Sequence, residues 1–219
     1  MNSREPKPAN FDDQLSEEEL SLVHSLDSPL KIQAFLDGVP YSAEDRNRCP
    51  LNVLRDRQAH CLDGALFAAA TLRRLGYPAL LVDIYPDPGM DDDHVLAIFQ
   101  HGSRLGAVAK SNFVGLRYRE AVYRGLRELV MSYFDNFFNV DGVKTLRHYT
   151  RPLNLKIFDR LDWTSSDAGA DAIEQRLLKL ARIPLLTTET AASLSPVDEL
   201  SYKAGLLNVN YAGLYKPKA

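Results

Sequence analysis

The chain of 219 residues contains very little cysteine, only Cys49 and Cys61. Two thiols are too few for a disulfide framework and too few for a four-thiolate metal site. The histidines His24, His101 and His148 are scattered without the spacing of metal ligands, so we expect no metal ion. One of the two cysteines is better explained as a working thiol.

The sequence also lacks long runs of one kind of residue. The formal net charge of −3 is spread along the chain, and no block of Lys and Arg is present that could follow a phosphate backbone. No apolar run reaches the roughly 18 residues that span a bilayer, and the N-terminus lacks the apolar stretch of a signal peptide. We therefore expect a cytoplasmic protein that binds neither nucleic acid nor membrane.

The composition is that of a globular protein, with 45% hydrophobic residues. A chain of this length favours one domain with extensions. Residues 1–14 hold two prolines and mixed charges without periodicity, which predicts a flexible arm. We expect the domain itself over residues 15–165 and a helical C-terminal extension over residues 166–219, packed on the same domain.

Local signals predict short helices, then a helix and three strands. Ser16 with Glu19 forms a capping box, and Ser28 followed by Pro29 is typical of a second helix start. Apolar residues at helical spacing predict a buried helix that begins near Cys61. The other predictions are strands over 79–85, 94–100 and 104–110, a long amphipathic helix over 119–136, and helices over 167–182 and 196–207.

Cys61 opens its helix in the string His-Cys-Leu-Asp-Gly-Ala. The free amide groups and the dipole at a helix N-terminus stabilise a thiolate, so this position predicts a lowered thiol pKa. A buried cysteine that packs as a small hydrophobe is the alternative. His94 begins the second strand, where an imidazole could take the thiol proton as a general base.

The residues between Cys61 and His94 carry a resemblance to a known family. The helix ends in Leu-Arg-Arg-Leu-Gly-Tyr-Pro-Ala over 72–79, a strand follows, and the next strand starts with His94. This arrangement resembles transglutaminase-like proteins over about residues 30–112. The resemblance implies an α+β fold of papain type, with a buried helix carrying the cysteine packed on an antiparallel sheet carrying the histidine, and additional C-terminal helices.

The third catalytic residue is less well defined. The family places an aspartate on the third strand, but hairpin pairing puts Ala109, Lys110 or Ser111 opposite His94, and none is a carboxylate. Lys110 there would disfavour an imidazolium. We therefore predict that the amide of Asn112 orients the imidazole, as asparagine does in papain-like enzymes.

Other side chains could contribute to the site. Asp83 and either Asp92 or Asp93 are rival candidates for orienting His94. The acidic run 91–93 is otherwise expected to be a solvated loop that pairs with Lys110 or nearby arginines. Gln58 is a candidate donor to an oxyanion, and Lys110 a candidate for contact with the substrate.

Two functions from different classes fit these observations. The first is a thiol enzyme that performs acyl transfer, by amide hydrolysis or deamidation, on a peptide, protein or small amide without a cofactor. The second is a catalytically degenerate module that uses the same cleft to bind a peptide or small metabolite. A thiol that reacts unusually fast near neutral pH would favour the enzyme.

Overall fold

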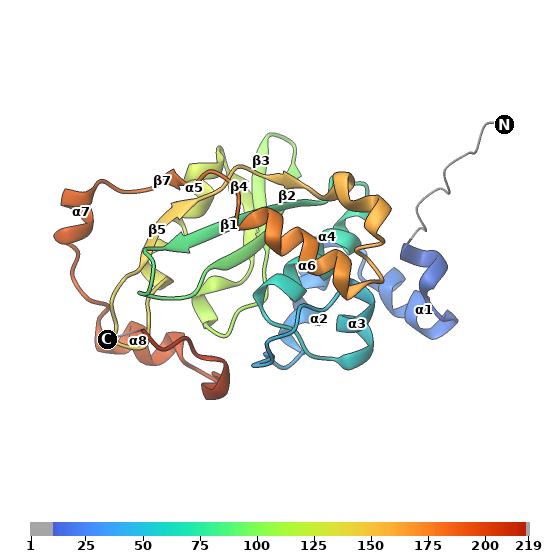
Figure 1. Cartoon of the computed structure of the whole chain (residues 1–219), viewed down its shortest axis with the longest axis horizontal. Helices are drawn as coiled ribbons and strands as arrows, with labels where there is room; N and C mark the ends of the chain where they lie inside the picture. The colour runs from blue at the N-terminus through green and yellow to red at the C-terminus, as the bar shows by residue number, and fades with distance from the viewer. Residues whose placement is uncertain (1–10, 218–219) are drawn as a thin grey trace.

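One antiparallel sheet forms the centre of the chain in the computed structural model, which describes residues 11–217. The strands follow the order β4-β3-β2-β1-β5-β7, and β6 pairs with β1 (Figure 1). Their bounds are β1 Leu80–Pro86, β2 His94–His101, β3 Arg104–Val108, β4 Arg119–Tyr123, β5 Leu146–Tyr149, β6 Leu153–Asn154 and β7 Ile183–Pro184.

Helices cover the sheet and extend to both sides of it. The α-helices are α1 Glu17–Ser25, α2 Pro29–Asp37, α3 Pro50–Asp56, α4 Cys61–Arg74, α5 Leu126–Met131, α6 Asp167–Leu177, α7 Thr188–Ala192 and α8 Glu199–Gly205. Short 3-10 turns are η1 Phe11–Gln14, η2 Val114–Leu116, η3 Phe134–Asn136, η4 Leu155–Leu161 and η5 Tyr211–Gly213. The predicted starts of α1 and α2 are confirmed, with Ser16 and Ser28 as N-caps.

The two faces of the sheet pack against different partners, as period-two alternation along a strand requires. On β2, Val95, Ala97 and Phe99 face the core that α2, α3, α4 and α6 complete. Leu96 and Ile98 face a second core, completed by residues of η2 and α5 and by Tyr133 and Phe137. The predicted α+β architecture is confirmed, since Cys61 opens a buried helix packed on a strand that begins at His94.

Helix α4 approaches the sheet very closely, and Gly64 makes this approach possible. A Cβ added at Gly64 would lie 2.2 Å from Cβ of Lys110, the second residue after the end of β3. The first turn of α4 therefore contacts the chain where β3 leaves β2. This packing fixes the position of the first turn of α4, and with it Cys61, relative to the sheet.

The predicted helix over 119–136 is wrong. Residues Arg119–Tyr123 form β4, which pairs with β3 through Leu105 opposite Tyr123 and Ala107 opposite Arg119. Gly125 interrupts the pattern, and only Leu126–Met131 is α-helical. The alternation of exposed and half-buried residues along 119–123 has a period of two, and pairing with the free edge of β3 outweighs the helical pattern that the later apolar residues suggested.

Both ends of the described chain pack against the domain. Phe11 is buried in the core on the α4 side, so the described part of the expected arm, residues 11–14, is ordered against the domain. Residues 1–10 of that arm lie outside the described residues. Ala170 and Ile173 of α6 belong to the same core, and β7 adds to the sheet, so the C-terminal part is integrated with the domain.

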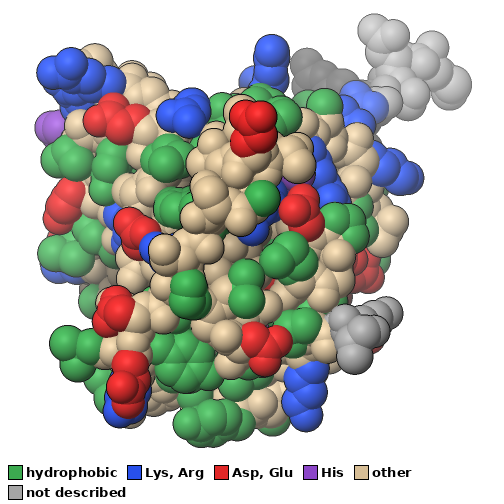
Figure 2. All heavy atoms as spheres, turned by 90° about the vertical axis from the view of Figure 1, so that its left-hand side faces the viewer, with side chains coloured by type: hydrophobic (Ala, Val, Ile, Leu, Met, Phe, Trp, Pro, Cys, Tyr) green, Lys and Arg blue, Asp and Glu red, His purple; other side chains and the backbone are tan. Residues whose placement is uncertain are grey.

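The surface is mixed in charge. On the face seen in Figure 2, acidic, basic and hydrophobic side chains are interspersed. Within residues 11–217, no helix combines the length and the apolar character needed to cross a membrane.

Candidate active site

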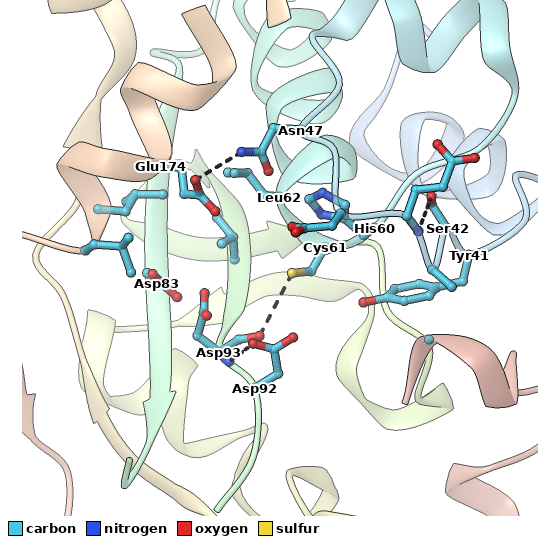
Figure 3. A pocket seen from close by; sticks show the side chains of 17 residues that line it. Tyr41, Ser42, Asn47, His60, Cys61, Leu62, Asp83, Asp92, Asp93 and Glu174 are labelled. Atoms are coloured by element: carbon cyan, nitrogen blue, oxygen red, sulfur yellow. Dashed lines mark hydrogen bonds between the residues drawn. The ribbon is translucent and has the colours of Figure 1, made fainter. Parts of the chain in front are cut away.

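Cys61 lies at the wall of a cavity of about 300 Å³ (Figure 3). His60 caps α4 in an extended conformation, so Cys61 is the first helical residue. Its Sγ is 3.9 Å from the carbonyl oxygen of Asp93, the residue that directly precedes β2. The thiol is therefore held beside the first residues of β2.

The cavity around the thiol is acidic. Among its described lining residues none is Lys or Arg, whereas six are Asp or Glu: Glu44, Asp45, Asp83, Asp92, Asp93 and Glu174. In Figure 3, Asp92 and Asp93 lie close to the Cys61 sulfur, and Asp83 and Glu174 lie further along the same wall. Asp92 and Asp93 thus line the cavity of the thiol, whereas Asp91 accepts a hydrogen bond from Thr145, so the acidic run is not simply a solvated loop.

The predicted lowering of the Cys61 pKa is wrong in direction. Burial raises the pKa of the thiol well above its usual value, and the charges of Asp93 and Asp92 raise it further. The N-terminus of α4 favours a thiolate, but its partial charge is smaller than those of the carboxylates that face the same sulfur. The surroundings of Cys61 therefore favour the neutral thiol over the thiolate.

Asp83 and Asp93 form a close carboxyl pair in this cavity. Burial is the first cause that raises both pKa values, to about 6 for Asp93 and well above the usual range for Asp83. The charge of Asp92 is the next cause for Asp93, and the charge of Asp93 is the next for Asp83. Two adjacent buried carboxylates repel each other, so the pair holds a proton near neutral pH.

His94 is 4% exposed and lines a second, smaller cavity of about 50 Å³. Its Nε2 lies 2.7 Å from the carbonyl oxygen of Leu116, which can only accept, so Nε2 carries the hydrogen. The other ring nitrogen, Nδ1, has no hydrogen-bond partner within residues 11–217. Burial lowers the pKa of the imidazole to about 4, which leaves His94 neutral with Nδ1 as the basic atom.

The structure places Cys61 and His94 in adjoining cavities without a hydrogen bond between them in the described part of the chain. The His94 ring lies on the face of β2 that packs against Tyr133, whereas the core under α4 lies on the other face. The two cavities share four lining residues. Asp92 and Asp93 lie just before β2, and Tyr41 and Gly213 come from distant parts of the sequence.

The amide of Asn112 is engaged elsewhere. Its Nδ2 donates to the carbonyl oxygen of Asn210 at 2.9 Å, and its Oδ1 accepts from the amide of Asn210 at 2.8 Å. The β2–β3 loop is Gly102–Ser103, and the ladder ends at Ala97 opposite Val108. The group that orients His94 is thus the backbone carbonyl of Leu116, which a search for side chains could not find.

Lys110 and Gln58 also lie away from the thiol. Nζ of Lys110 donates to the carbonyl oxygens of Leu36, at 2.9 Å, and Val39, so it holds the end of α2 and does not pair with the acidic run. Burial lowers the pKa of Lys110 to about 8. Gln58 donates to Glu44 at 3.2 Å and is not among the residues that line the cavity.

The wall formed by residues 41–47 is fixed by a buried arginine. Arg48 is 1% exposed, and its guanidinium contacts Glu44 and Asp56 and lies 3.8 Å from Asp63. Asp63 also accepts from the amides of Arg48, at 2.7 Å, and His60, at 3.1 Å. The charge of Glu44 is therefore balanced by Arg48. Arg48 makes no ion pair with the other described carboxylates that line the cavity.

Three comparisons place these observations beside known proteins. No family model matches the chain, and no curated protein matches it. Among solved structures, the chain is similar to Legionella pneumophila LapG, with 14% identity and a TM-score of 0.41 over 76% of this chain and 93% of LapG. EGTA-treated LapG matches with 13% identity and the same TM-score over 76% and 94%. Similarity at this level does not assign the chain to a family.

Sequence reasoning missed several functional contacts. Tyr41 and Gly213 line both cavities, although they are distant in sequence from Cys61 and His94. Asp83 offered a usable signal, because a single carboxylate inside the apolar strand Leu-Leu-Val-Asp-Ile-Tyr needs a polar environment. Within residues 11–217, no group of His, Cys, Asp and Glu is arranged to hold a metal ion.

Proposed function

We propose that the chain is a transglutaminase-like thiol enzyme that performs acyl transfer, with Cys61 as nucleophile and His94 as base. The observation that carries the proposal is the Sγ of Cys61, 3.9 Å from the carbonyl oxygen of the residue directly before His94, at the wall of a cavity. The anchoring of His94 Nε2 on Leu116 supports it, because Nδ1 is left free to accept a proton.

The proposed reaction has two halves. The thiol proton passes to Nδ1 of His94 as sulfur bonds to the carbonyl carbon of an amide or ester, and the imidazolium then protonates the leaving amine or alcohol. Water attacks the thioester, His94 takes a proton from it, and the acid leaves as the thiol is restored. Both groups are neutral at rest, so the imidazole must accept the proton during attack. The ring must also reach the sulfur from the adjoining cavity.

An active-site acylation experiment tests this proposal. The full chain is mixed with 4-nitrophenyl acetate, and acetylated cysteine is located by mass spectrometry of peptides. We expect the adduct on Cys61, a rate about 100-fold lower in His94→Ala, and a normal rate in Cys49→Ser, because Cys49 is buried and its pKa is raised to about 12. Acetylation of Cys61 that is equally fast in His94→Ala would reject the dyad.

A binding module is the second candidate, and the raised pKa of Cys61 favours it. A thiol that remains protonated amid carboxylates is a poor nucleophile, and the cavity would then serve recognition alone. The same acylation experiment separates the two functions. A binding module would show no Cys61 adduct under conditions in which an unfolded control peptide containing cysteine is acetylated.

A further inference from the structure

The strongest unexplained feature of the site is a concentration of acidic side chains in a cavity whose described lining holds no arginine or lysine. Asp83, Asp92, Asp93 and Glu174 line one cavity without an arginine or lysine among its described lining residues. Among the described residues, Glu174 accepts a hydrogen bond from the neutral amide of Asn47 alone, at 3.1 Å. Carboxylates that are brought together in this way repel one another, and either a shared proton or a bound cation relieves the repulsion.

An orphaned oxygen shows where the missing partner belongs. Asp83 is 1% exposed, and its Oδ1 is buried without a hydrogen-bond partner in the described part of the chain. An unpaired buried acceptor is destabilising, so such atoms are rare unless a ligand uses them. Asp83 lines the same cavity as Cys61, which gives this acceptor a route to a ligand.

The cavity favours an organic cation. The described residues contain no cluster arranged to hold a metal ion. Tyr41 also lines the cavity, and in Figure 3 its hydroxyl points toward Cys61 and Asp92, where it could accept a hydrogen bond from an ammonium or guanidinium group. A volume of about 300 Å³ is at the lower end of the range for ligand pockets and accepts one long side chain.

We propose that this cavity binds a substrate carrying a guanidinium or ammonium group, which sits against Asp83 and Asp93 beside the Cys61 thiol. The inference rests on the proposed function for its reaction but names the substrate class independently. A bound cation offsets the charges of the carboxylates, and this favours the thiolate. The acidic wall thus keeps the nucleophile protonated until a substrate of the right charge is present.

Binding is measured first in Cys61→Ser, so that no reaction interferes. The probes are Nα-acetyl-arginine amide and Nα-acetyl-lysine amide, with Nα-acetyl-citrulline amide as the uncharged analogue of the arginine probe, in isothermal titration calorimetry. We expect both cations to bind about tenfold or more tightly than citrulline. Asp83→Asn should remove this preference, whereas Asp141→Asn, at an exposed position outside the cavity, should retain it.

Equal affinity for arginine and citrulline probes would overturn the proposal, as would a preference that survives both Asp83→Asn and Asp93→Asn. Displacement of the arginine probe by an equal concentration of Ca²⁺ would also overturn it, by assigning the carboxylates to a metal. A second measurement compares acylation of wild type by the 4-nitrophenyl esters of Nα-acetyl-arginine and Nα-acetyl-citrulline, and we expect the arginine ester to react about tenfold faster.

The two measurements keep the two proposals separate. Charge-selective binding without any Cys61 acylation would retain the cation site and reject the enzyme. Acylation of Cys61 at the same rate by both esters, without charge-selective binding, would retain the enzyme and reject the cation site.

Discussion

The two cavities that meet at the start of β2 treat their ionisable groups in different ways. Around Cys61 the wall is acidic, and burial together with negative charge opposes the thiolate. Around His94 the wall combines Phe113, Phe137 and Phe138 with the carboxylates of residues 91–93, and burial opposes the imidazolium. One side excludes an anion and the other excludes a cation. The comparison shows that a cysteine and a histidine near one strand end need not form an ion pair at rest.

The close packing of helix α4 against the chain after β3 can be disrupted at Gly64. Gly64→Ala should lower the free energy of unfolding by about 2–3 kcal/mol, because the new methyl group would overlap Cβ of Lys110 by more than the helix preference of alanine can offset. Urea denaturation measures the change. Gly38→Ala is the control, since a Cβ there meets only ordinary contacts at 3.5 Å, and it should alter stability by less than about 0.5 kcal/mol. Equal effects would contradict the close approach.

The burial of His94 should make the fold sensitive to acid. Its pKa is about 4 in the folded chain and about 6.5 when unfolded, so the unfolded state binds more protons between these values. Stability should therefore fall as pH drops from 6.5 towards 4, by about 2 kcal/mol at pH 5 from this group.

The matched variant isolates this contribution from the buried carboxylates, whose raised pKa values act in the opposite direction. His94→Gln keeps a side chain that can donate to Leu116 but cannot gain a charge. For each protein, the free energy of unfolding at pH 5 is subtracted from that at pH 7. This difference should be about 2 kcal/mol lower in His94→Gln than in wild type. An identical pH dependence would show that the imidazole is not held neutral.

The acidic side should make the thiol slow to react without a cation. Alkylation of Cys61 by iodoacetamide should rise only above the pH of an ordinary cysteine, which reverses the expectation from the helix N-terminus. Asp93→Asn and Asp92→Asn should each lower the midpoint and speed the reaction at pH 8 several-fold, because each removes a nearby negative charge. A midpoint below the ordinary value in wild type would contradict the structure.

The smallest expected effect on acylation concerns Asn112, which binds Asn210, close in sequence to Gly213 in the wall of both cavities. Asn112→Ala removes two hydrogen bonds to Asn210 and should lower stability by about 1 kcal/mol, while the acylation rate constant of Cys61 changes little because Leu116 orients His94. Lys110→Met should cost more stability, since it removes both bonds to the end of α2. A large loss of acylation in Asn112→Ala alone would restore its predicted orienting role.

The sequence predicted elements whose signals are local. Ser16, Ser28 and Pro29 start their helices through contacts within one turn. The helix from Cys61 has a continuous apolar face and is followed by Gly76, whose φ of 89° favours glycine. Strands β1, β2 and β3 follow one another through short connections, so their order was also predictable.

What could not be predicted depends on contacts between distant parts of the chain. The pairing of β4 with β3 competes with a helical pattern, and only the free edge of β3 decides between them. The tautomer of His94 depends on one backbone carbonyl, at Leu116. The direction of the Cys61 pKa shift depends on whether the Asp92 and Asp93 side chains face the thiol. The sequence of two adjacent residues before a strand does not reveal this.

The buried arginine behind the cavity wall has a consequence for how the site should respond to salt. Mobile ions screen charges that solvent reaches, with a Debye length of about 10 Å at 0.1 M, but they act weakly on buried pairs. Arg48 and Asp63 are both buried, so the wall they support should keep its shape in concentrated salt. Asp45 and Asp92 are exposed, and the attraction that they exert on an approaching cation should fade. Ionic strength therefore separates the shape of the site from its long-range attraction.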